Sequence, residues 1–181
     1  MNNYVSRGGI KLAHALKEFE IDVKGLTVLD VGSSTGGFVD CLLQNGAAKV
    51  YALDTAYGEF AWKLRNVPRV VVIERQNILF FEQAKQGATL LMEHNIDLIT
   101  IDVTFTSLEK ILPVVKKFLK ENGKIIALVK PQYERQDIAL KHHGVIPSEL
   151  LPEILNNFKF QKIIESPIKG GSGNTEFLAL C

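Results

Sequence analysis

Short, nearly continuous apolar runs alternate along the chain with segments whose apolar residues recur at helical spacing. The runs are typical of strands buried on both faces of a sheet, and the spaced segments predict helices. The predicted strands are Thr27–Gly32, Lys49–Asp54, Val70–Glu74, Asp97–Val103, Gly123–Lys130, Gln161–Pro167 and Thr175–Cys181. The predicted helices are Gly9–Phe19, Gly37–Asn45, Phe60–Leu64, Phe81–Glu93, Leu108–Lys120 and Ser148–Asn157. This alternation predicts an open α/β sheet with helices on both faces.

The carboxyl-terminal end departs from the alternation. Only the loop 168–174 separates the last two predicted strands, which is too short for a helical crossover. These two strands should therefore be antiparallel neighbours, so that six strands run parallel and one is reversed. In the helix before them, Ser148 resembles an N-cap residue, and Pro152 predicts that the helix is short or kinked.

Length and composition favour one soluble globular domain. The chain has 181 residues, of which 46% are apolar and 23% charged. No apolar run approaches the roughly 20 residues that span a bilayer, and the first residues lack the layout of a signal peptide. We therefore expect a cytoplasmic protein without membrane contact.

Net charge and cysteine content indicate neither a nucleic-acid-binding protein nor a metal site. The net charge is +1, so overall charge does not indicate a nucleic-acid-binding protein. The basic residues that follow the fourth predicted strand are typical of the solvated face of a helix: Lys110, Lys116, Lys117, Lys120 and Lys124. Cys41 and Cys181 have neither a CxxC spacing nor nearby histidines, and we interpret them as core thiols rather than metal ligands.

A glycine-rich turn follows the first predicted strand. The strand ends in an acidic residue and a glycine, passes through small polar residues and enters a helix, which offers free backbone N–H groups to a ligand. The residues of this candidate cofactor loop are Asp30, Gly32, Ser33, Ser34, Thr35, Gly36, Gly37 and Phe38. The spacing matches neither the GxGxxG fingerprint of dehydrogenases nor a phosphate-binding P-loop.

Polar residues also end the next two predicted strands. Asp54 closes the second strand, where a carboxylate can accept hydrogen bonds from ribose hydroxyls. Asn77 follows the third strand and can contact an adenine edge. Because ligands in such sheets bind at the carboxyl ends of the strands, the three strand ends together predict a nucleoside-containing cofactor.

The fourth and fifth predicted strands end in residues suited to proton transfer. Asp102 ends the fourth strand, and Lys130 ends the fifth, immediately before Pro131. Burial disfavours the charged form of a lysine, which makes Lys130 a candidate general base. The alternative is that Lys130 only positions a substrate hydroxyl, and the sequence leaves both interpretations open.

The residues at these strand ends, together with further motifs along the chain, resemble those of a known family, the TlyA (hemolysin A-like) branch of the FtsJ-type ribose methyltransferases. The resemblance extends over nearly all of the sequence. The segments that carry it are Tyr4–Leu12, Asp30–Phe38 with its STGGF, Gln44–Tyr51, Pro68–Val70, Val129–Gln132 and Gly173–Phe177. Together these motifs are highly specific.

The resemblance implies a fold, a cofactor and a reaction. The fold is the Rossmann-like class I methyltransferase fold, with strand order 3-2-1-4-5-7-6, and the cofactor is S-adenosylmethionine, which Asp102 also contacts. The family uses a Lys-Asp-Lys-Glu tetrad, which by motif corresponds to Lys11, Asp102, Lys130 and Glu176. The implied reaction is methylation of a ribose 2′-hydroxyl, of cytidine in ribosomal RNA, so that ribosomal RNA or ribosomal subunits are the expected partners.

The sequence departs from the family in two places. Members usually carry an S4-type RNA-binding domain first, whereas residues 1–181 are expected to hold only the methyltransferase domain, with the first catalytic lysine in segment 1–24. The loop between Tyr133 and Pro147, which includes His142 and His143, is shorter than expected and is a candidate substrate contact. We interpret the two histidines as surface residues rather than ligands.

Three other functions compete with this interpretation. A small-molecule methyltransferase would have the same sheet but no need of Lys11 and Lys130. A non-catalytic RNA-binding or ribosome-assembly factor would keep the fold without using Lys130 beside Asp102. A hemolysin-like cytolytic protein would need an amphipathic or membrane-spanning segment, and the sequence shows none.

Overall fold

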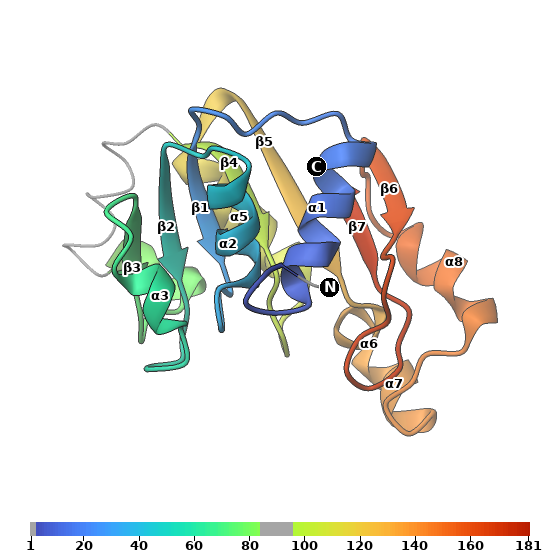
Figure 1. Ribbon diagram of the computed structural model, residues 1–181. Coiled ribbons are helices and arrows are strands. Elements are labelled where there is room, and N and C mark those ends of the chain that lie inside the picture. The colour runs from blue at the N-terminus through green and yellow to red at the C-terminus, as the bar shows by residue number, and fades with distance from the viewer. Residues whose placement is uncertain (1–2, 84–95) are drawn as a thin grey trace.

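Seven strands form a sheet with the order β3-β2-β1-β4-β5-β7-β6 in the computed structural model, which describes residues 3–83 and 96–181 (Figure 1). The strands are β1 (Thr27–Val31), β2 (Lys49–Leu53), β3 (Val70–Ile73), β4 (Ile96–Ile101), β5 (Leu119–Val129), β6 (Lys162–Glu165) and β7 (Phe177–Leu180). β1 to β5 pair in parallel, and β7 is antiparallel to both β5 and β6. The predicted strand order and the reversed last strand are confirmed.

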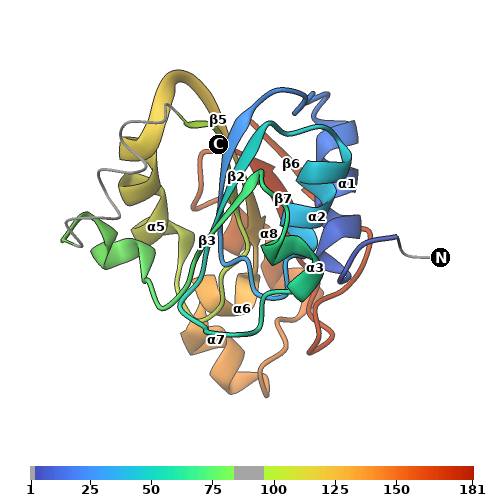
Figure 2. The ribbon, with the colours of Figure 1, turned by 60° about the vertical axis from the view of Figure 1, so that its left-hand side comes forward.

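Helices cover both faces of the sheet, as Figure 2 shows from the side of β3. α1, α2 and α3 pack on one face, whereas α5, η1 and η2 pack on the other. The segment after β5 adds short helices beside the edge formed by β7 and β6 (Figure 1). The helices are α1 (Gly8–Glu18), α2 (Gly37–Gln44), α3 (Trp62–Arg65), η1 (Ile78–Gln83), α5 (Leu108–Val115), η2 (Lys116–Phe118), α6 (Pro131–Glu134), α7 (Gln136–Lys141), η3 (Ser148–Leu150) and α8 (Leu151–Leu155).

Successive residues of the central strands enter opposite cores. In β4, Leu98 packs with the cluster beneath α1 and α2, whereas its neighbour Ile99 packs with the cluster beneath α5. Side chains alternate between the faces of a strand, so a strand covered on both sides is apolar at most positions. This packing explains why the central strands appear in the sequence as continuous apolar runs rather than as alternating patterns.

Several predicted boundaries are wrong in position. The helix predicted over Leu108–Lys120 ends at Val115, and β5 begins at Leu119 rather than at Gly123, because Leu119 pairs with Ile96 ahead of a register shift. Of the helix predicted over Phe81–Glu93, the first three positions belong to the 3-10 helix η1, and residues 84–93 lie outside the described residues.

The predicted cap at Ser148 is also wrong. Ser148 lies inside η3, where its hydroxyl contacts Glu149, and α8 begins after Leu150 without a side-chain cap. Pro152 occupies the first turn of α8 and has no N–H group, which removes one of the donors that a cap would satisfy. The predicted short helix is confirmed.

A close backbone approach joins the end of β1 to the end of β4. Gly32 has a φ of 84°, and a Cβ atom added there would lie 2.2 Å from the backbone oxygen of Asp102. Gly25 also has a positive φ, of 78°, but its added Cβ would meet nothing within 4 Å. A side chain at Gly25 would meet only the cost of a left-handed backbone, whereas one at Gly32 would also collide with Asp102.

Gly32→Ala should destabilise the protein much more than Gly25→Ala. The left-handed backbone alone costs an alanine about 1–2 kcal/mol, and overpacking against Asp102 should add roughly 1–3 kcal/mol at Gly32. Urea unfolding of both variants measures the difference in the free energy of unfolding. Equal losses would show that the approach of β1 to β4 is not tight.

Candidate active site

Two adjoining clefts open at the carboxyl edge of the parallel strands. The larger has a volume of about 410 Å³ and lies over the ends of β1, β2 and β4. The smaller, of about 250 Å³, lies between the turn after β1 and the start of α1. Gly32, Ser34 and Asp102 line both clefts, so the two form one continuous site. An elongated ligand can therefore extend from one cleft into the other past Asp102.

The turn after β1 is built from left-handed residues. Gly32, Ser34 and Gly36 have φ values of 84°, 47° and 96°. A Cβ atom at Gly36 would meet Leu64, and one at Gly37 would lie 2.2 Å from the hydroxyl of Ser6. Glycine is thus required on both sides of the turn, because α3 packs against one side and the segment before α1 against the other.

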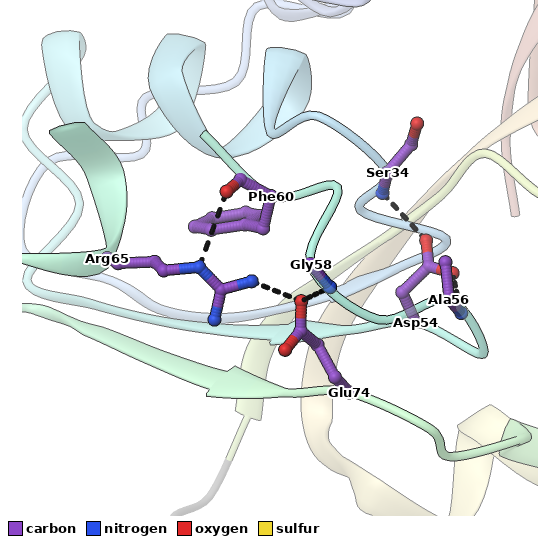
Figure 3. Close-up of polar contacts among 7 residues, drawn as sticks. All are labelled: Ser34, Asp54, Ala56, Gly58, Phe60, Arg65 and Glu74. Atoms are coloured by element: carbon purple, nitrogen blue, oxygen red, sulfur yellow. Dashed lines mark hydrogen bonds and ion pairs between the residues drawn. The ribbon is translucent and has the colours of Figure 1, made fainter. Parts of the chain in front are cut away.

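Asp54 holds the turn from the end of β2. One carboxylate oxygen accepts a hydrogen bond from the backbone N–H of Ser34 at 2.7 Å, and the other accepts from that of Ala56 at 2.8 Å (Figure 3). Asn77 lies on the same cleft, where its side-chain oxygen accepts from the backbone N–H of Leu79 at 2.9 Å. Asp54 lines the larger cleft, and each of its carboxylate oxygens can accept one further hydrogen bond.

Two lysine–carboxylate pairs border the junction of the clefts. Lys130 Nζ lies 2.7 Å from Asp102 Oδ1, and Lys11 Nζ lies 2.5 Å from Glu176 Oε2. Lys11 and Glu176 are 11% and 4% exposed at their side chains, so this pair is largely removed from water. Gly170 packs against Glu176, since a Cβ atom there would lie 2.4 Å from the carboxylate. The four predicted tetrad residues therefore lie as two ion pairs. Asp102 lines both clefts, Lys11 the smaller and Lys130 the larger, whereas Glu176 is buried behind Lys11 and lines neither.

Comparison with known proteins assigns the chain to a family. The model of the FtsJ-like methyltransferase family matches residues 4–180. The chain belongs to this family. TlyA of Mycobacterium tuberculosis, named a 16S/23S rRNA (cytidine-2′-O)-methyltransferase, is 38% identical, and the match covers 96% of this chain and 66% of TlyA. YqxC of Bacillus subtilis, described as a candidate rRNA methyltransferase, is 43% identical, with 97% of this chain and 64% of YqxC covered.

A solved structure shows the same fold over nearly the whole chain. A protein of Streptococcus thermophilus, described as a candidate hemolysin, superposes with a TM-score of 0.89 at 39% identity. The superposition covers 99% of this chain and 67% of that protein. The chain thus spans about two thirds of the length of these FtsJ-like relatives.

Most predicted cofactor residues of this FtsJ-like domain lie on the clefts. Those that line one or both are Gly32, Ser33, Ser34, Thr35, Gly37, Phe38, Asp54, Asn77 and Asp102. Gly36, within the turn, lies against Phe60 and Leu64 and lines neither cleft. Asp30 is fully buried and lines neither cleft. The structure therefore does not bring these two residues to the open site.

The structure adds residues that the motifs alone did not single out. Ser6 and Arg7 line the smaller cleft beside Lys11, and Thr104 lines the larger one. Phe105 is 77% exposed with a φ of 62°, and its ring centroid lies 5.1 Å from that of Tyr133. These two aromatic residues each follow a tetrad residue by three positions, which is the one sequence signal that could have revealed them.

Glu134 connects the two strand ends that carry Asp102 and Lys130. Its carboxylate accepts from the Ser107 hydroxyl at 2.5 Å and from the backbone N–H of Leu108, at the start of α5. Burial raises the pKa of Glu134. The segment after β5 is thereby tied to the segment after β4.

The described residues hold no group of three or more His, Cys, Asp or Glu side chains placed to bind a metal ion. Within the same residues, no helix combines the length and apolarity needed to cross a membrane.

Asp30 lies at the base of the turn, where its backbone oxygen accepts a hydrogen bond from the Ser33 hydroxyl at 3.1 Å. Thr100 donates to one oxygen of the Asp30 carboxyl at 2.6 Å, and the other oxygen has no hydrogen-bond partner among the described residues. Burial, with smaller contributions from the carboxylates of Asp102 and Asp54, raises the pKa of Asp30 to about 7. The neutral form is therefore favoured in the folded protein relative to the unfolded chain.

The buried Asp30 carboxyl should make folding pH-dependent. Its folded pKa lies above the unfolded value of 3.8, so the free energy of unfolding should fall as pH rises from about 4 to about 7. In Asp30→Asn, the free energy of unfolding should fall less with pH. Relative to the wild type, the variant should therefore be more stable at pH 8 than at pH 5. Urea unfolding at both pH values measures the change. An equally steep fall in the variant would show that Asp30 is already ionised at low pH.

Proposed function

We propose that this FtsJ-like domain transfers a methyl group from S-adenosylmethionine to a ribose 2′-hydroxyl of ribosomal RNA. One observation carries the proposal: each cleft is lined by a lysine that is paired with a carboxylate, Lys11 with Glu176 in the smaller and Lys130 with Asp102 in the larger. Buried ion pairs are costly to desolvate, and structure alone gives little reason to hold two in an open cleft. A binding factor without catalytic activity has no use for this arrangement.

The clefts fit S-adenosylmethionine. The larger cleft offers the Asp54 carboxylate to ribose hydroxyls and an apolar wall of Ile78, Leu79 and Val103 to a base. The smaller cleft offers small polar residues and the backbone of the turn, suited to the amino-acid end. In this arrangement the reacting centre would lie near Asp102, where the clefts meet. Asp30 would support the turn without contacting the cofactor.

The lysines supply proton transfer and orientation. S-adenosylmethionine supplies a methyl group that is activated by a sulfonium. In our proposal, Lys130 Nζ would accept the proton of the 2′-hydroxyl while the hydroxyl oxygen takes the methyl group, with S-adenosylhomocysteine as the leaving group. Asp102 stabilises the resulting ammonium, at the 2.7 Å separation that the structure shows. Lys11, held by Glu176, orients the hydroxyl.

An RNA substrate is supported by the exposed aromatic side chain of Phe105 beside this site. Unpaired bases stack on exposed aromatic side chains, and Phe105 with Tyr133 provides such a surface next to the Lys130–Asp102 pair. The M. tuberculosis relative is named as a methyltransferase of cytidine riboses in ribosomal RNA. A small-molecule methyltransferase would have little need of an exposed aromatic side chain at this place.

Lys130→Ala should lower kcat for methylation of ribosomal subunits by at least about 100-fold, because it removes the general base. Radiolabel transfer from S-adenosylmethionine, with mapping of the label to a ribose, measures this. Lys116→Ala is the matched control and should retain full activity, because Lys116 is an exposed lysine of η2 that lines neither cleft.

Lys130→Arg separates proton transfer from positioning. Arginine keeps the charge but stays protonated. Activity as low as that of Lys130→Ala supports the base, whereas intermediate activity assigns a positioning role. Label on a base, or equal label in Lys130→Ala, would contradict the proposed reaction.

Asp54→Ala should weaken binding of S-adenosylhomocysteine by roughly 10-fold or more, because a hydrogen bond to a charged group contributes about 1.5–3 kcal/mol. Asp54→Asn keeps one acceptor oxygen and should lose less. Calorimetric titration measures both affinities, and thermal unfolding shows whether the turn held by Asp54 remains folded. Unchanged affinity in the alanine variant would exclude Asp54 as the ribose ligand.

A further inference from the structure

Two large aromatic side chains are exposed in the segment that joins β2 to β3. Trp62, the single tryptophan of the chain, is 77% exposed, and Tyr57 is 67% exposed. Their neighbours Phe60 and Leu64 are buried against the turn after β1. The segment therefore has an inward apolar side that packs on the domain, and Trp62 and Tyr57 remain outside it.

A carboxylate clamp holds this segment in shape. Glu74 Oε1 accepts a hydrogen bond from the backbone N–H of Gly58 at 2.8 Å and also pairs with the guanidinium of Arg65 (Figure 3). Arg65 Nε in turn donates to the backbone oxygen of Phe60 at 3.3 Å. The clamp thus ties Gly58, in the loop next to Tyr57, and Arg65, the last residue of α3, to Glu74 after β3, and it also holds the backbone of Phe60 ahead of α3. The exposed aromatic side chains are carried on a fixed loop.

Cations accompany these aromatic side chains. The guanidinium carbon of Arg75 lies 4.0 Å from the centroid of the Tyr57 ring, and the backbone N–H of Arg75 donates to Ala56. The Lys63 side chain, next to Trp62, is 61% exposed, and its ammonium lies 3.3 Å from the carboxylate of Asp40. Aromatic faces combined with exposed cations are typical of surfaces that bind unpaired nucleic acid, where bases stack and phosphates pair with the cations.

This surface adjoins the proposed active site. The backbone N–H of Ala61 donates to the backbone oxygen of Thr35, which lines the smaller cleft, at 3.2 Å. Glu59 lines the larger cleft. An RNA strand with one ribose in the site can therefore continue across α3.

We infer that Tyr57, Trp62 and Arg75 form a second contact surface for RNA, on which unpaired bases flanking the target nucleotide stack. The inference rests on the proposed function, because it names where the substrate of that reaction extends. A protein partner is the other class that exposed aromatic residues can bind. The stacked guanidinium and the continuity with the proposed RNA site favour RNA.

Tryptophan fluorescence tests the contact directly, because Trp62 is the single tryptophan. Titration with a single-stranded oligocytidylate and with 23S and 16S ribosomal RNA transcripts should quench the emission saturably, and less strongly at higher salt. A fully paired RNA duplex of the same length should quench less. Absence of quenching by all of the single-stranded and ribosomal RNAs would overturn the inference.

Kinetics test whether the contact serves the reaction. Stacking of one base contributes about 1–3 kcal/mol, so Trp62→Ala or Tyr57→Ala should raise the KM for RNA roughly 10-fold. Trp62→Phe should restore most of the loss, and Arg75→Ala should raise KM and reduce its salt dependence. Lys116→Ala is the control and should leave KM unchanged. Affinity for S-adenosylhomocysteine should stay constant in the Trp62 and Tyr57 variants.

The outcomes separate this inference from the proposed function. If Lys130→Ala abolishes methylation while Trp62→Ala and Tyr57→Ala leave the KM for RNA unchanged, the second surface is refuted and the function stands. If the wild type binds RNA with quenching but transfers no methyl group, the surface stands and the function fails. Dimerisation that is lost in Trp62→Ala, without quenching by RNA, would assign the surface to a protein partner instead.

Discussion

The parallel register of β2, β1 and β4 determines where the functional groups of this protein lie. Val31 is paired with Leu53 on one side and with Ile101 on the other. Gly32, Asp54 and Asp102 each follow one member of this row, so backbone hydrogen bonding alone brings three strand ends to one level. Ligands of open α/β sheets bind at this edge, because the chain leaves the strands there in diverging directions.

The buried ion pair of the site forms only because the sheet and its helices hold the two charged side chains close together. Lys11 and Glu176 are 165 residues apart in sequence, yet they form a 2.5 Å pair in a largely buried place. Removing one partner of such a pair typically costs about 3–5 kcal/mol, since the other charge is left without compensation. α1 and β7 must therefore be placed accurately by their apolar packing before the pair can form.

Three non-glycine residues with a left-handed backbone lie at the carboxyl edge of the parallel strands. Ser34, Phe105 and Arg75 are non-glycine residues in the left-handed region, and each follows a strand that ends at this edge. Such conformations are costly and persist where the surrounding structure holds them in place, often at functional sites. Here Asp54 holds Ser34, and contact with Tyr133 accompanies the exposed ring of Phe105.

The sequence by itself determined the sheet, its reversed last strand and the strand-end positions of Asp54, Asp102 and Lys130. These features follow from local apolar runs and loop lengths, which are properties of neighbouring residues. The family motifs also singled out Lys11 and Glu176 in advance. The start of β5 was predicted at the wrong residue, because Leu119 joins the strand by pairing with Ile96, a contact that the residues around Leu119 do not indicate.

Only the tertiary structure decided which predicted residues reach the clefts. It keeps Asp30 and Gly36 off both clefts, although both lie within the motif, and it sets Tyr57 and Trp62 on a clamped loop beside the site. Burial and pairing between distant segments depend on how helices and loops pack over the sheet edge. No local pattern of residue types encodes that packing, because it arises from contacts between parts of the chain that are far apart in sequence.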